Sequence, residues 1–126
     1  MLEQDFIMRR IHTMVLAMLK IFFHIDTQLP DAQLPDSLSE RVILDGLLAL
    51  VDAGDINEAE NRLFDLLDGQ NREMLKIALV FYARLNEKSD AFLEANDFGR
   101  AEIQQGIENA AARFGLGSVA GLFSDD

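Results

Sequence analysis

The chain has 126 residues, of which 49% are hydrophobic, and a formal net charge of −11 from 22 acidic and 11 basic residues. This length fits one domain, and the charge makes nucleic acid a poor partner because phosphate backbones are repelled. The absence of cysteine excludes a disulfide framework and a Cys-based zinc site, and it is compatible with a cytoplasmic location. With two prolines and few β-branched runs, the composition favours an all-α domain spanning residues 1–126.

Residues 1–24 predict an amphipathic N-terminal helix. Its apolar side chains recur at spacings of three and four residues, and the central ones are Ile7, Ile11, Met14, Met18 and Phe22. The segment holds three basic and two acidic residues, whereas residues 25–126 hold 8 basic and 20 acidic ones. Its apolar run at 14–23 is too short to cross a bilayer, which takes about 20 residues. The segment also lacks the features of a signal peptide, so we expect it in the mature protein.

Residues 25–36 predict an extended connector, because QLPD occurs twice there and proline disfavours helix. A helical core is predicted over 37–115 and a tail over 116–126. In the core, Ser37 with Glu40 forms a capping box that starts a helix, and Gly54 ends it. The next helix follows at once, so the pair must fold back as a hairpin.

The segment that begins near Met74 is apolar nearly all round, which is typical of a central, buried helix. Asn71 is expected to cap it. The pattern continues to about Ala95 with a bend near Asn86, and a last helix follows to about Phe114. The sequence therefore predicts about five helices in an antiparallel bundle.

The hairpin resembles part of a tetratricopeptide repeat. Gly54, Ala59, Leu63 and Leu66 have the spacing of that repeat's turn and second helix. No second copy follows at the 34-residue period, and a solenoid needs about three repeats. We therefore expect one tetratricopeptide-like hairpin within a bundle and not a repeat array.

A wider resemblance covers most of the chain. The segments EQDFIMRRI, INEAENRLFDLLD, ALVFYARLNEKSDAFLEANDF and EIQQGIENAAARFG resemble a family of short, all-helical bacterial proteins, mainly from Gram-positive species, whose function is unknown. This resemblance implies a cytoplasmic helical protein without an assigned activity. It brings no catalytic residues.

The residue types that carry chemistry form no recognisable grouping. His12 and His24 fall on different faces of one helix, and no acidic residue stands at metal-ligand spacing from either. Acidic residues such as Glu58 and Glu60 lie on the polar side of an amphipathic helix, where charges are normally solvated. The serines lack the context of a nucleophile. The sequence predicts no enzyme, no catalytic residue, no cofactor and no metal.

The leading functional prediction is a non-enzymatic protein-interaction module that self-associates through the N-terminal helix. Methionine-rich faces adapt to varied partners, so we expect binding by Ile7, Ile11, Met14, Met18 and Phe22. Tyr82 and Arg84 are further candidates beside a groove of the central helix. The alternatives are that Tyr82 packs in the core and that the N-terminal helix packs on its own domain. The alternative function is a peripheral membrane protein held by this helix, which is less favoured because the acidic body opposes an anionic surface.

Overall fold

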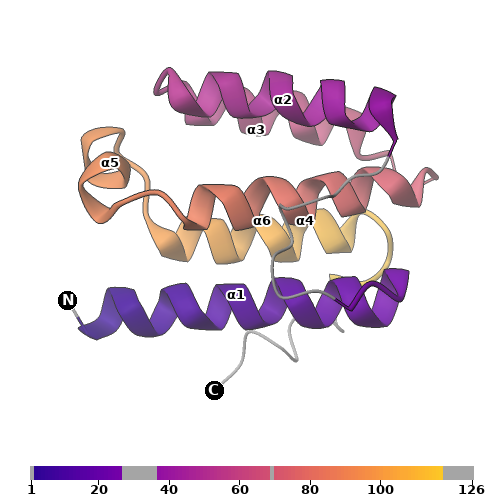
Figure 1. Cartoon of the computed structure of the whole chain (residues 1–126), viewed down its shortest axis with the longest axis horizontal. Coiled ribbons are helices and arrows are strands. Elements are labelled where there is room, and N and C mark those ends of the chain that lie inside the picture. Colours follow the sequence, from indigo (N-terminus) through magenta and orange to yellow (C-terminus); the bar gives the residue numbers. More distant parts are fainter. Residues whose placement is uncertain (1, 27–36, 69, 118–126) are drawn as a thin grey trace.

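The computed structural model describes residues 2–26, 37–68 and 70–117, and these residues form six α-helices without a strand. The helices are α1 (Leu2–Phe23), α2 (Leu38–Asp52), α3 (Ile56–Leu66), α4 (Arg72–Asn86), α5 (Asp90–Ala95) and α6 (Arg100–Ala112). They form three layers: α2 with α3 on one side, α4 with α6 in the middle, and α1 on the other side (Figure 1). The all-α prediction is confirmed. Most of the predicted connector and tail lies outside the described residues.

Helix α4 forms the centre of the core. Its side chains are buried on nearly every side, as the all-round apolar sequence predicts, and Leu75, Ile77, Leu79 and Leu85 have no exposed surface. It packs against α1, α2 and α6. The helix begins one residue after Asn71, whose side chain accepts a hydrogen bond from the Glu73 N–H at 3.1 Å. The predicted cap is therefore confirmed.

Helices α2 and α3 form the predicted hairpin. The Ser37 hydroxyl accepts a hydrogen bond from the Glu40 N–H at 3.4 Å and starts α2. Gly54 follows α2 with a φ of +90°, a conformation that favours glycine. A Cβ at Gly54 would lie 2.7 Å from the Asn96 side-chain oxygen, so the turn also needs glycine for its approach to the end of α5. The tetratricopeptide-like arrangement of this hairpin stays a prediction.

The predicted count of about five helices is not confirmed: the described residues form six, because the fourth predicted helix is broken. Helix α4 ends at Asn86, and α5 starts anew after Ser89, whose hydroxyl accepts a hydrogen bond from the Phe92 N–H at 3.0 Å. The break is held by Arg100, which donates to the carbonyl oxygens of Asn86 at 3.1 Å and of Lys88 at 2.6 Å. These bonds satisfy carbonyl groups that a continuous helix would have used itself.

Arg100 joins three helices at this end of the molecule. Its side chain is 2% exposed, donates to the Asn86 side-chain oxygen at 3.2 Å and pairs with the Asp90 carboxylate. The Asn86 amide in turn donates to the Met8 carbonyl oxygen at 3.0 Å. The junction therefore fixes α1, α4, α5 and α6 relative to one another.

Candidate functional site

The face of α1 that was predicted to bind a partner lies against its own chain. Ile11, Met14 and Met18 are at most 1% exposed, and Ile7 and Phe22 are half-buried against the core. The helix packs on both α4 and α6. This is the alternative in which the helix covers its own domain. Partner binding by these side chains stays a prediction, and it would require α1 to leave the core.

Tyr82 and Arg84 lie in different surroundings. Tyr82 is fully buried, and its hydroxyl donates a 2.6 Å hydrogen bond to the Glu60 carboxylate. Arg84 is half-buried and lines a separate hollow of about 220 Å³ with Leu48 and Asp52. The structure therefore does not bring the two side chains to one groove.

The two histidines are exposed, His12 on α1 and His24 just after its end. Among the residues that the structure describes, no cluster of three or more His, Asp or Glu side chains could hold a metal ion. Within the same part of the chain, no helix is long and apolar enough to cross a bilayer.

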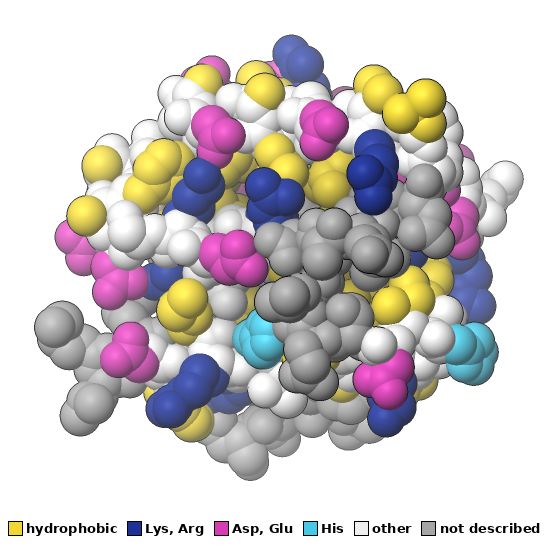
Figure 2. Space-filling model, in the orientation of Figure 1, with side chains coloured by type: hydrophobic (Ala, Val, Ile, Leu, Met, Phe, Trp, Pro, Cys, Tyr) yellow, Lys and Arg dark blue, Asp and Glu magenta, His cyan; other side chains and the backbone are white. Residues whose placement is uncertain are grey.

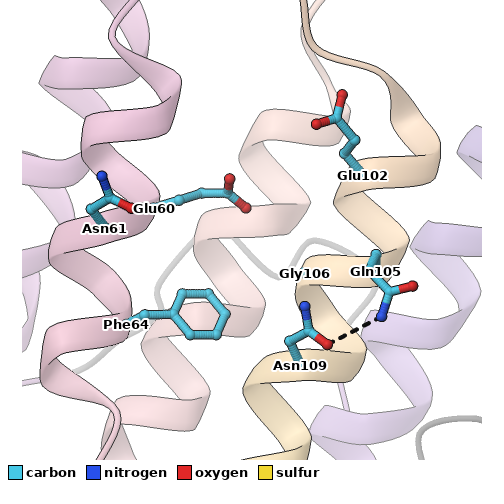
Figure 3. A pocket seen from close by; sticks show the side chains of 7 residues that line it. All are labelled: Glu60, Asn61, Phe64, Glu102, Gln105, Gly106 and Asn109. Carbon is cyan, nitrogen blue, oxygen red and sulfur yellow. Dashed lines mark hydrogen bonds between the residues drawn. The ribbon is translucent and has the colours of Figure 1, made fainter.

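A pocket of about 340 Å³ lies between α3 and α6 (Figure 3). It is lined by Glu60, Asn61 and Phe64 from α3 and by Glu102, Gln105, Gly106 and Asn109 from α6. The Phe64 ring and the Glu60 carboxylate both point into the space between the two helices (Figure 3). The Gln105 amide donates to the Asn109 side-chain oxygen at 3.1 Å, which orients both amides on the α6 wall. The pocket combines acidic, amide and aromatic groups.

Tyr82 packs against Gly106 and bonds Glu60, two residues that line this pocket. A Cβ at Gly106 would lie 2.4 Å from the Tyr82 hydroxyl oxygen and 2.5 Å from its Cζ. Any larger residue would therefore displace the phenol ring. Because Gly106 leaves this room, Tyr82 reaches from α4 past α6 to the Glu60 carboxylate on α3 and holds it in place.

Burial raises the pKa of Glu60 above its ordinary value, because water is excluded from the charged form. The hydrogen bond from Tyr82 acts in the opposite direction, and repulsion from the Glu102 carboxylate on α6 raises the pKa further. Burial, followed by the nearby Glu60 charge, likewise raises the pKa of Tyr82. The hydroxyl therefore stays protonated and remains a donor to the carboxylate.

A third hollow, of about 370 Å³, lies between α2 and α3. Its lining consists of Val42, Ile43, Gly46, Leu47, Arg62, Asp65 and Leu66. We call it the hairpin groove. In Figure 2, hydrophobic side chains reach the surface along the top of the molecule, where Figure 1 places α2. Leu38, Val42 and Leu66 are 78%, 64% and 38% exposed.

Neither the pocket between α3 and α6 nor the hairpin groove was predicted from the sequence. Glu60 was interpreted as a solvated residue of the polar side of α3, but it is half-buried and bonded to a tyrosine 22 residues away. Its sequence signal was weak: Phe64 follows one helical turn later, so an aromatic ring and a carboxylate share one flank of α3. Val42 and Leu66 extend the apolar faces of α2 and α3 beyond the part that the core covers. These extra apolar residues were the sequence signal for the hairpin groove.

Comparison with known proteins places the chain in a family. No curated protein and no solved structure matches it. One family, described as a family of unknown function (DUF6483), matches residues 1–115, which include all six helices. The predicted membership of an uncharacterised family is confirmed. The chain therefore belongs to the DUF6483 family of unknown function.

Proposed function

We propose that this protein is a non-enzymatic, cytoplasmic interaction module that self-associates, and that two copies meet at the hairpin groove. The exposed apolar side chains around the groove carry this proposal. Leu38 and Val42 stand one turn apart on α2, so they share a face, and Leu66 lies across the groove on α3. Apolar residues that gather in this way mark interfaces, whereas single exposed ones do not.

The charge of the groove lets a second copy approach there more easily than elsewhere on the surface. With a net charge of −11, two chains repel each other over most of their surfaces. The lining of the groove contains one arginine and one aspartate, Arg62 and Asp65, so its formal charge is zero. In a two-fold symmetric contact the same surface meets itself, and Arg62, whose Nε bonds the Glu58 carboxylate of its own helix at 3.0 Å, can turn its remaining N–H groups toward the aspartate of the other copy.

The position of the groove on the hairpin also supports the proposal. A tetratricopeptide-like hairpin cannot bury all of its apolar surface alone and stacks on a neighbouring unit. Contact through α1, or its insertion into a membrane surface, needs an apolar face that already packs on α4 and α6. The absence of a catalytic grouping in the sequence supports a non-enzymatic role.

The test is the molar mass in solution, measured by light scattering over a range of concentrations. We expect the full chain to approach twice its 14.1 kDa mass. Val42→Asp should return it to a monomer, because the charge would be buried without a partner in the contact. The matched control is Ile21→Asp on α1, where a 51% exposed apolar residue lies away from the groove.

The control variant should keep the dimer. A wild-type chain that stays monomeric at all concentrations would contradict the proposal. A dimer that survives Val42→Asp but is lost in Ile21→Asp would move the contact to α1.

A further inference from the structure

The pocket between α3 and α6 is independent of the hairpin groove and has a different chemistry. It offers a carboxylate on each wall, Glu60 and Glu102, and an aromatic ring, Phe64 (Figure 3). We propose that this pocket binds a primary alkylammonium group, with the nitrogen near Glu60 and Glu102 and the alkyl chain against Phe64. This inference goes beyond self-association and does not depend on it.

The carboxylates of Glu60 and Glu102 favour a cationic ligand. Glu60 uses one oxygen to accept the Tyr82 hydrogen bond, and its other oxygen has no hydrogen-bond partner among the described residues. The carboxylates of Glu60 and Glu102 repel each other, and this repulsion raises the pKa of Glu60. A cation between them would relieve the repulsion and supply N–H donors to the unused oxygen.

Tyr82 makes the site preorganised. It fixes the Glu60 carboxylate through a 2.6 Å bond, and its own ring is held between core residues and Gly106. A ligand therefore does not have to restrict a mobile side chain, which lowers the entropic cost of binding.

An organic cation fits better than a metal ion. The structure has no group of three or more potential metal ligands within its described part, whereas an ammonium group has three N–H donors and can use neutral acceptors. The side-chain oxygen of Asn61 supplies such an acceptor on the α3 wall. The Phe64 ring lines the pocket and offers apolar surface to an alkyl chain.

The experiment is calorimetric titration of the full chain with 1,4-diaminobutane at constant ionic strength. We expect saturable binding at one site. Glu60→Gln and Glu102→Gln should each weaken it about tenfold, because each removes a charged acceptor. Both variants keep a side-chain oxygen for the bonds from Tyr82 and from the Gly99 N–H, and a thermal melt of each checks that it folds.

Three controls separate the site from general attraction to an acidic protein. Glu94→Gln removes the same charge from the exposed side of α5 and should change affinity less than twofold. The uncharged 1,4-butanediol should not bind. Val42→Asp, which changes the hairpin groove, should bind the diamine as the wild type does. Absence of saturation, or equal weakening by Glu94→Gln and Glu60→Gln, would overturn the proposal.

A second titration identifies the source of the amine. Lysine capped at both backbone ends presents the same ammonium group on an alkyl chain. Tighter binding of capped lysine would assign the pocket to a protein side chain, and tighter binding of the diamine would assign it to a free amine. If neither compound binds, the proposal fails, whatever the outcome for self-association.

Discussion

The central layer of α4 and α6 is covered very differently on its two sides. On one side, the single helix α1 packs on both α4 and α6 and buries Ile11, Met14 and Met18 completely. On the other side, the hairpin packs on α4 through α2, and a pocket of about 340 Å³ separates α3 from α6. The α1 side is apolar and closed, whereas the hairpin side buries apolar residues such as Val51 and Leu63 but also contains a polar, partly open pocket. The comparison shows that a wide apolar stripe in a sequence marks the closed side, whereas partly exposed polar side chains line the side where the cover is incomplete.

Met18→Ala should have the largest effect on the free energy of unfolding. Met18 has no exposed surface, and truncating a buried methionine costs about 2–5 kcal/mol through lost burial and the cavity that remains. Val42→Ala on the hairpin should change the stability of the monomer by less than about 0.5 kcal/mol, since Val42 is mostly exposed there. Urea unfolding of both variants measures the difference. A cost below 1 kcal/mol for Met18→Ala would show that α1 is held loosely, and would restore the prediction that its apolar face can serve a partner.

Gly106→Ala should have the next largest effect, on the open side. The added Cβ would displace the Tyr82 phenol, whose hydroxyl oxygen lies 2.4 Å from its position, and such overpacking costs roughly 1–3 kcal/mol. The matched control is Gly46→Ala in α2, where an added Cβ meets nothing within 4 Å. That substitution should stabilise the protein by up to about 1 kcal/mol, because alanine is the better helix former. Thermal melts that shift in the same direction for both variants would contradict the close Tyr82–Gly106 packing.

The local parts of this fold could be predicted from the sequence, and the pocket could not. Helix starts at Ser37 and Asn71 depend on a side chain within three residues, and the burial of α4 follows from its composition. The break after Asn86 is maintained by Arg100, which stands 14 residues later in the sequence. Even so, Ser89 is a residue type that commonly caps a helix N-terminus, so the start of α5 had a local sequence signal.

The site depends on longer-range relations. Glu60, Tyr82 and Gly106 come from three helices, and each is ordinary in its own segment: a charge on a polar face, an aromatic residue in a buried helix, a glycine within a helix. The half-burial of Glu60 results from the distance at which α3 sits from α6. Side-chain volume in the core sets that distance, and no local pattern encodes it.

The smallest expected effect is a pH dependence confined to the open side. In the folded chain, burial raises the pKa of Glu60 above its ordinary 4.5, with Tyr82 from α4 opposing the shift and Glu102 from α6 adding to it. The folded state therefore holds the proton more tightly than the unfolded state. As pH rises from 4.5 through the raised pKa, the wild type loses stability relative to Glu60→Gln, which does not titrate there. The loss should stay below about 1 kcal/mol, because the carboxylate is partly exposed and screened by solvent.

Urea unfolding of the wild type and Glu60→Gln across this pH range measures the difference. Glu94→Gln removes an equal charge from the surface of α5 and corrects for the change in net charge. We expect the stability advantage of Glu60→Gln over the wild type to grow with pH and then become constant above the raised pKa. An advantage that shrinks with rising pH would mean that the folded state stabilises the charged form of Glu60. The hydrogen bond from Tyr82 would then outweigh burial and the repulsion from Glu102.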